Sequence, residues 1–285
     1  DDTDWIVRVS TEQAYTAQIH GRYDEAGISL RAVRPLSLQI DNPVTLFRFL
    51  SRYALQLGYE RQFDAAISEM HAALALVRLH GEATDEMTML NNLGTLHYYR
   101  GERDEVMAIS NTIIGYYRSV NDRQYLSDAL GNRGVLLWSL KRYAEAVEVL
   151  LEALELDEQA GKVNSEVGAL VTLGYCYAGL GDDDLAVVYL RSALRKALDG
   201  ELISLALDAM CGIASVWAKQ REAERAAEIY GLALSHPASD VDIETTVTPL
   251  IEGLRAQLDA ATLTAALERG KQLSFEAAVA EALGH

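Results

Sequence analysis

The chain has 285 residues, of which 49% are hydrophobic and 24% are charged, with 20 Gly and 4 Pro. A disordered chain would be poorer in apolar residues and a collagen far richer in Gly and Pro, so both classes are excluded. Acidic residues outnumber basic ones by 42 to 25, and the excess holds on both sides of residue 120. A surface of this sign repels phosphate backbones and anionic membranes, so direct nucleic-acid binding is not expected.

The sequence is typical of a cytoplasmic protein. Its two cysteines, Cys176 and Cys211, are too few for a disulfide framework and fit a reducing compartment. No apolar run approaches the ~20 residues that span a bilayer, and no signal peptide precedes the first charged segment. We therefore expect no membrane partner. Because the first residue is Asp1 and not Met, we expect the chain to be a piece of a longer protein.

A pattern with a step of 40 residues runs along most of the chain. It is seen first in small apolar residues that end six similar segments: Ala26, Ala66, Val106, Ala146, Ala186 and Ala226. Twelve residues before each of them stands a second small residue: Ala14, Ala54, Gly94, Gly134, Gly174 and Ala214. Small residues let two helices approach closely, so each unit is expected to be a helical hairpin.

The pattern predicts six helix pairs. Their expected ranges are 4–20 and 22–37, 43–60 and 62–80, 85–100 and 103–120, 122–140 and 142–160, 163–180 and 182–198, and 200–219 and 222–234. Pro43 suits the first turn of its helix, where a missing N–H costs little. Asp182, Asp183 and Asp184 open another helix, where carboxylates favour the positive end of the dipole.

These residues resemble a known repeat family. Leu93-Gly94 followed by Gly101-Glu102-Arg103, and the segment Leu173–Asp182 followed by Ala186, are similar to the tetratricopeptide repeat. That repeat normally recurs every 34 residues, so six extra residues imply longer helices. The resemblance implies an all-α, right-handed superhelix of about six repeats over residues 1–237, with a concave wall lined by the first helix of each pair.

The periodic pattern ends at His236-Pro237, and residues 238–285 predict a C-terminal helical extension. Its helices are expected near 240–257, 260–269 and 275–283, the last one capped by Ser274. Leu250, Leu254 and Leu258 share one face. Repeat arrays need such a cap to cover their last apolar surface.

The C-terminal part carries a second resemblance. The segments Ala227–Ala233, Leu254–Leu258 and Glu268–Val279 are similar to the end of signal-transduction ATPases with numerous domains, including regulators of the maltose-regulon activator type with a LuxR-like DNA-binding module. In that family an inducer binds the tetratricopeptide region and relieves its inhibition of the ATPase. The chain itself contains no G-x-x-x-x-G-K-[ST] phosphate loop and no basic recognition helix.

No catalytic or metal-binding pattern stands out. The six histidines show no paired metal-ligand spacing, and His97 falls in a column expected to be core. Cys176 and Cys211 are expected to pack in the interior. We therefore expect no enzymatic activity, no metal and no cofactor.

The candidate ligand-binding residues lie on the first helices, where the residues one, two and three before the small residue of each pair and those one and four after it are expected to face inward or nearly so. They are polar and aromatic side chains that could hold a peptide backbone or a small polar molecule: Arg48, Arg52, Asn91, Asn92, Tyr98, Asp128, Asn132, Trp138, Thr172 and Tyr175. Asn92 and Asn132 occupy the same column in consecutive units. Ordinary packing between repeats explains these residues about equally well.

Arg48 and Arg52, one turn apart, could bind a carboxylate or phosphate. An internal salt-bridge network is the alternative.

The leading functional hypothesis is a sensor that binds an inducer, be it a small molecule, a peptide or a protein, in its groove and regulates an ATPase module of the same chain. The alternative is a separate scaffold that binds peptides of partner proteins.

Overall fold

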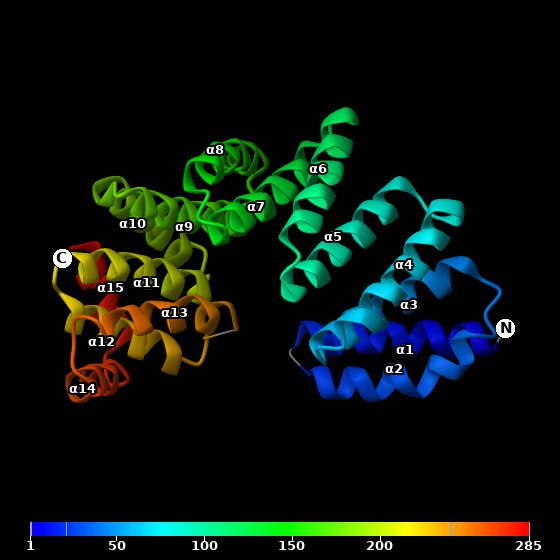
Figure 1. Ribbon diagram of the computed structural model, residues 1–285, viewed down its shortest axis with the longest axis horizontal. Helices are drawn as coiled ribbons and strands as arrows, with labels where there is room; N and C mark the ends of the chain where they lie inside the picture. Colours follow the sequence, from blue (N-terminus) through cyan, green and yellow to red (C-terminus); the bar gives the residue numbers. More distant parts are fainter. Residues whose placement is uncertain (1, 21, 240, 285) are drawn as a thin grey trace. The chain divides into compact units, whose positions relative to one another are not determined.

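The computed structural model describes residues 2–20, 22–239 and 241–284. The expected turn residue Gly21, the expected helix start at residue 240 and His285 lie outside these ranges. The described residues form α-helices and contain no strand, which confirms the all-α prediction (Figure 1). None of the described helices has both the length and the hydropathy needed to cross a membrane.

The chain divides into two compact units, residues 1–119 and 120–285. Unit 1 contains α1 to α6, with bounds Asp2–Ile19, Tyr23–Ser37, Pro43–Tyr59, Phe63–His80, Ala83–Arg100 and Arg103–Ser119. Unit 2 contains α7 to α15, with bounds Arg123–Ser139, Tyr143–Ala160, Val163–Leu180, Asp183–Asp199, Ile203–Lys219, Ala223–Ser235, Val241–Leu254, Ala260–Gly270 and Phe275–Leu283.

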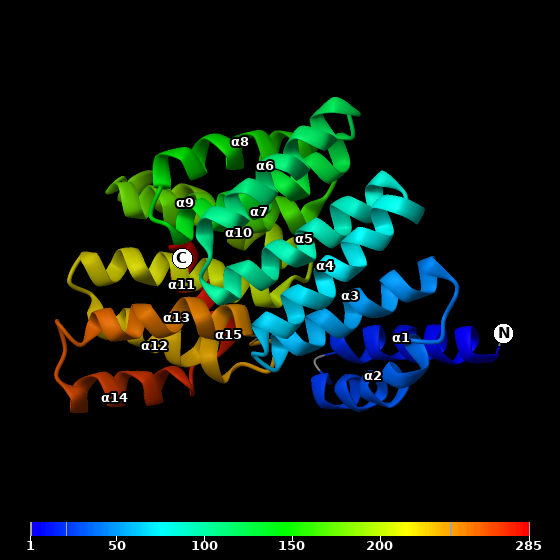
Figure 2. The same ribbon diagram turned by 45° about the vertical axis from the view of Figure 1, so that its right-hand side comes forward.

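The helices form the six predicted pairs, α1 with α2 through α11 with α12 (Figure 2). Within each unit, the first helix of a pair packs on both helices of the preceding pair, so first helices lie side by side. The predicted bounds agree to within about three residues. Two predicted helix ends are corrected. Helix α11 begins at Ile203 and not near 200, because Glu201 has a left-handed backbone conformation (φ 56°). Helix α13 ends at Leu254 and not at 257, because the chain turns there toward Asp259, which caps α14.

Local signals in the sequence set the helix starts. The Asn42 side chain accepts hydrogen bonds from the N–H groups of Val44 (3.0 Å) and Thr45 (3.4 Å), and Pro43 follows it in the first turn. Asp182 caps α10 through the Leu185 N–H (3.1 Å), and Ser274 caps α15 as predicted. These caps satisfy backbone donors that a helix start leaves unpaired.

The turns inside the pairs repeat a single geometry. A residue with positive φ stands at Arg61, Gly101, Lys141, Gly181 and Arg221, again at steps of 40. The N–H of the next residue donates to the carbonyl five positions earlier, which ends the preceding helix. The turn therefore falls at the same position of the repeat in the second to the sixth pair.

Small residues sit where the helices cross. The alanines of both small-residue columns are fully buried: Ala14, Ala26, Ala54, Ala66, Ala146, Ala186, Ala214 and Ala226. At Gly174 a Cβ atom would lie 2.4 Å from Leu190 Cγ, and Gly134 stands in the same relation to Leu150. Glycine is thus required in these two pairs because a leucine of the second helix fills the space.

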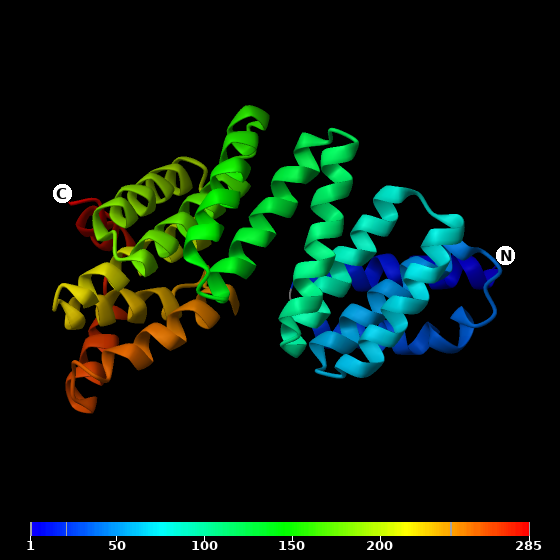
Figure 3. The same ribbon diagram turned by 45° about the horizontal axis from the view of Figure 1, so that its top comes forward.

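The C-terminal helices share the core of unit 2 with α9 to α12 (Figure 3). Leu254, Leu263 and Ala282 are buried in it. At the crossing of α12 and α14 the backbones touch: a Cβ on Gly270 would lie 2.0 Å from the Glu228 carbonyl oxygen, and Gly231 meets the Leu267 carbonyl in the same way. This packing is the arrangement expected of a cap, while the boundary at residue 237 stays a prediction.

The crossing of α9 and α10 can be tested with two glycines of one helix. Replacing Gly174 by Ala forces Leu190 to move, so we expect a loss of about 1–3 kcal/mol of folding free energy. A Cβ on Gly168 would meet no atom within 4 Å, so Gly168→Ala should stabilise the helix by up to about 1 kcal/mol. Urea unfolding of both variants measures the difference, and equal midpoints would contradict the packing.

Candidate functional site

In unit 1, the predicted groove residue Asn92 is bonded to the neighbouring pair. Its Nδ2 donates to the Ser51 hydroxyl oxygen (3.2 Å), which joins α5 to α3. Asn92 remains partly exposed and Asn91, one position before it, is exposed. The amide of Asn92 therefore serves the contact between repeats, and its carbonyl oxygen is the part that a ligand could use.

Tyr98 lies at the last turn of α5 and is half-buried. The guanidinium of Arg103 lies over its ring, 4.1 Å from the centroid, and also donates to the Tyr98 carbonyl oxygen (3.1 Å). Tyr99 meets it edge-on at 5.7 Å. The ring is held in place on one side by a cation.

Arg48 and Arg52 lie on α3, and in the described chain neither forms an ion pair with a carboxylate within 4 Å, although Glu12 is close enough to Arg52 to stabilise its charge. The guanidinium of Arg52 lies 3.8 Å from the centre of the Tyr15 ring, and burial lowers its pKa from the ordinary value. Arg48 is exposed and, among the described residues, makes no ion pair. The salt-bridge network considered for these two arginines is thus not formed by the described part of the chain.

In unit 2, the aromatic candidates form a partly buried cluster. The rings of Trp138 and Tyr175 are 5.4 Å apart, and the Tyr175 hydroxyl donates to Asp208 Oδ1 (2.8 Å). Tyr175 is only 8% exposed, and burial raises the pKa of its phenol well above the usual range. Thr172 is 9% exposed, and its hydroxyl donates to the Gly168 carbonyl of its own helix (2.9 Å). Trp138 is the more accessible of the two rings.

The remaining candidates differ in their surroundings. Asp128 forms an ion pair with Lys162, whose ammonium also donates to the Ser127 hydroxyl (3.1 Å) and lies 3.7 Å from Asp157. Burial raises the pKa of Asp157. Asn132 is exposed on α7. Asp128 is therefore held within its own unit by Lys162.

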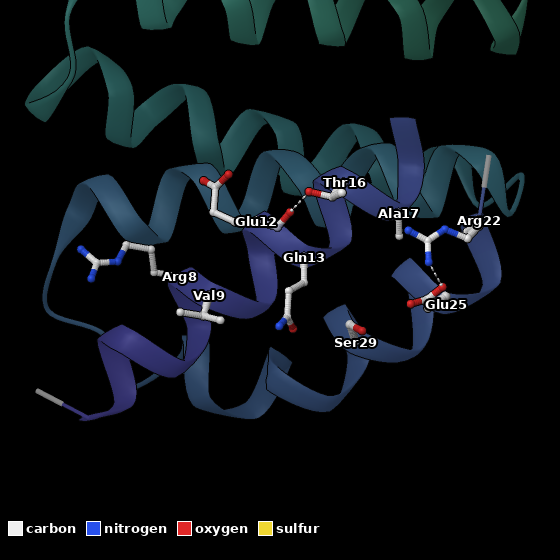
Figure 4. A pocket seen from close by; sticks show the side chains of 9 residues that line it. All are labelled: Arg8, Val9, Glu12, Gln13, Thr16, Ala17, Arg22, Glu25 and Ser29. Atoms are coloured by element: carbon white, nitrogen blue, oxygen red, sulfur yellow. Dashed lines mark hydrogen bonds and ion pairs between the residues drawn. The ribbon is translucent and has the colours of Figure 1, made fainter. Parts of the chain in front are cut away.

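A broad hollow that the sequence did not indicate lies between α1 and α2 (Figure 4). It measures about 630 Å³. Its lining is mostly polar and comes from both helices: Arg8, Val9, Glu12, Gln13, Thr16, Ala17, Arg22, Glu25 and Ser29. Gln13 points from α1 toward α2, and Arg22 pairs with Glu25 (2.8 Å).

The 40-residue register explains this hollow. The equivalents of Gln13, Thr16 and Ser29 in the second pair are Tyr53, Gln56 and Glu69. Each of these three contacts the first pair: Tyr53 lies under Arg34 (5.5 Å), Gln56 accepts from Gln18 (3.2 Å), and Glu69 binds Arg34 (2.6 Å). The hollow is thus the stacking face of the first pair, which other helices cover in the later pairs.

The titratable groups of the interior have structural surroundings. His97 is 9% exposed, and its Nδ1 is 2.6 Å from Glu102 Oε2, as expected for a packed imidazole. Burial raises the pKa of the Cys176 thiol to about 12 and that of Cys211 well above the usual range. Neither thiol forms a thiolate near neutral pH. Among the described residues no three His, Cys, Asp or Glu side chains gather as metal ligands.

The hydroxyl of Tyr175 offers a test of the cluster in unit 2. Removing it in Tyr175→Phe leaves the ring contact with Trp138 but deprives Asp208 of a hydrogen bond. Because bonds to charged groups contribute about 1.5–3 kcal/mol, we expect a destabilisation of that size in thermal unfolding. An unchanged melting temperature would show that the bond contributes nothing.

Comparisons with known proteins agree with the repeat geometry. Residues 125–199 match the family model of the tetratricopeptide repeat. No curated protein sequence matches the chain significantly.

Solved structures share the fold over most of the chain at low sequence identity. Aspartyl phosphate phosphatase F from Bacillus subtilis is 13% identical, with a TM-score of 0.73 over 93% of this chain and 70% of that one. A signal-transduction ATPase with numerous domains from Pyrococcus horikoshii, which has a tetratricopeptide-repeat sensor, is 16% identical, with a TM-score of 0.67 over 95% of this chain and 43% of that one. NprR in complex with its cognate peptide NprX is 14% identical, with a TM-score of 0.66 over 94% and 77%. The chain therefore has a tetratricopeptide-type repeat fold, with a family match in residues 125–199.

Proposed function

We propose that this chain is the ligand-sensing domain of a signal-transduction ATPase with numerous domains. It binds an inducer on the inward faces of its first helices and, without inducer, holds a nucleotide-binding oligomerisation module of the same chain inactive. The inducer shifts this balance only by binding the active form more tightly than the inhibited one. The proposal includes no catalytic residue and no cofactor, and its setting is the cytoplasm.

The observation that carries the proposal is the likeness to the Pyrococcus horikoshii protein. That likeness extends over 95% of this chain but only 43% of the other. A repeat domain of this length is thus found beside further domains in one protein of similar fold. The C-terminal segments that resemble this class of regulator also support the sensor proposal.

The side chains of the first helices support a binding role. Asn132 and Asn91 are exposed, Tyr98 and Trp138 are half-buried rings, and Arg48 has no acidic partner in the described chain. Amides that both donate and accept can hold a peptide main chain. Aromatic rings with a polar edge are frequent in binding hot spots.

A second candidate is a separate scaffold that binds peptides of partner proteins. The NprR structure, which has a similar fold and contains a bound peptide, favours it. The coding sequence upstream of the Asp1 codon distinguishes the two. A phosphate-binding loop in the same reading frame supports the sensor, and its absence from the complete gene supports the scaffold.

The ligand-binding face is tested by a thermal-shift screen of metabolites and short peptides. A ligand at a hundred times its Kd stabilises the chain by about 2.7 kcal/mol. In Asn132→Ala and Trp138→Ala a tenfold weaker ligand would give about 1.4 kcal/mol. Retention of the full shift in Asn132→Ala, Trp138→Ala and Asn92→Ala would reject the assigned face.

Asn92→Ala requires its own control because it also breaks the bond to Ser51. Ser51→Ala removes the same hydrogen bond and keeps the amide. If both variants lose the ligand equally, the bond acts by holding α3 against α5. If only Asn92→Ala loses it, the amide contacts the ligand.

A further inference from the structure

Three arginines gather on the first helices of unit 1. Arg8 on α1 and Arg48 on α3 are 40 residues apart and therefore occupy the same position in consecutive pairs, and Arg52 follows Arg48 by one turn. Arg8 and Arg48 line one small cavity between α1 and the start of α3. The sequence pattern had indicated Arg48 and Arg52 but not Arg8.

Five other arginines of unit 1 are held by carboxylates. Arg22, Arg31, Arg34, Arg78 and Arg100 each form an ion pair with a carboxylate at 2.5–2.9 Å. Among the described residues, Arg8 and Arg48 form none. Because Arg8 and Arg48 line one cavity and neither is paired with a carboxylate, both guanidinium groups are available to an external anion.

The cavity suits a small group. Its volume is about 120 Å³, which admits water and a small polar group. Of its polar lining, Asn42 is engaged in capping α3, and the Thr11 hydroxyl donates to the Val7 carbonyl (2.7 Å). The donors left for a ligand are the two guanidinium groups, the Asn42 amide nitrogen and the Thr45 hydroxyl, aided by the positive N-terminal end of α3.

The charge of the lining selects among anions. Glu12 lines the same cavity, and its carboxylate repels a doubly charged phosphate more than a singly charged carboxylate. The net charge of −17 acts in the same direction. Next to the cavity, the partly exposed Tyr15 ring with Arg52 over it offers an apolar surface with a fixed cation.

We propose that the cavity between Arg8 and Arg48 binds the carboxylate of the inducer, so that the inducer is a carboxylic acid, either a small acid or a peptide. This inference rests on the proposed function, because it assigns a ligand chemistry to the same face. Arg8 and Arg48 form the two sides of the site, Arg52 and Tyr15 contact the adjoining part of the ligand, and Glu12 discriminates against phosphate.

The test follows the arginine Nε–H signals of the full 285-residue chain by NMR at constant ionic strength. The probes are succinate, tri-alanine with a free carboxyl end, tri-alanine amide and inorganic phosphate. Saturable shifts of Arg8 and Arg48 with a carboxylate probe, and none with the amide, are expected. Tighter binding of tri-alanine than of succinate identifies a peptide as the source, and the reverse order identifies a small acid.

Variants locate the site. Arg8→Gln and Arg48→Gln should each lower the affinity for the carboxylate probe at least fivefold. Arg195→Gln removes the same charge from an exposed position on α10 of unit 2, and it should leave the affinity unchanged. Glu12→Gln should raise the affinity for phosphate more than the affinity for the carboxylate probe.

Three results would overturn the inference: no saturable shift with either carboxylate, equal affinity in Arg48→Gln and Arg195→Gln, or tighter binding of phosphate than of carboxylate by the unmodified chain.

Failure of the carboxylate site is distinct from failure of the proposed function. An inducer that needs Asn132 and Trp138 but tolerates Arg48→Gln refutes the carboxylate site alone, and carboxylate binding without an inducer in the wider screen refutes the sensor alone.

Discussion

The close crossing of two helices at small residues is the constraint on which the fold depends. Gly174 leaves space that Leu190 fills, and Gly134 does the same for Leu150. A side chain at either glycine would separate the helices and remove the buried contacts between them. Because these positions recur every 40 residues, each pair has nearly the same shape. The next first helix can then pack on the preceding pair in the same way.

Because the helix pairs repeat one geometry, the residue types at their solvent-facing positions can differ from pair to pair. The column that carries Arg8 and Arg48 in unit 1 carries Asp128 and Asp208 in unit 2. The two aspartates are engaged within their unit, Asp128 by Lys162 and Asp208 by the Tyr175 hydroxyl. The two arginines have no such partner. Equivalent positions of the repeat therefore make contacts within unit 2, whereas in unit 1 they remain available to an anion.

The sequence predicted the helices well because their signals are local. Asn42-Pro43, Asp182 and Ser274 mark helix starts by bonds that span two or three residues, and periodicity supplied the pairing. It did not predict that Asn92 bonds Ser51 or that Tyr175 is buried against Asp208. Those outcomes depend on which neighbouring pair a side chain meets, 41 and 33 residues away. Arg8 could have been found, since it shares the column of Arg48.

The first and last helices show why periodicity alone does not define such a domain. On α1, Gln13 and Thr16 stand where α3 has Tyr53 and Gln56 and α5 has the buried Leu93 and Leu96, so equivalent positions of the first helices are polar in some pairs and apolar in others. At the other end, Leu254 and Ala266 keep the 40-residue register, yet α12 packs directly on α14 because Gly231 and Gly270 bring the backbones into contact. The last pair is therefore covered by helices that do not repeat its own geometry. Exposed positions of the first helices can change without loss of the array, and Arg8, Arg48 and the exposed asparagines Asn91 and Asn132 occupy such positions.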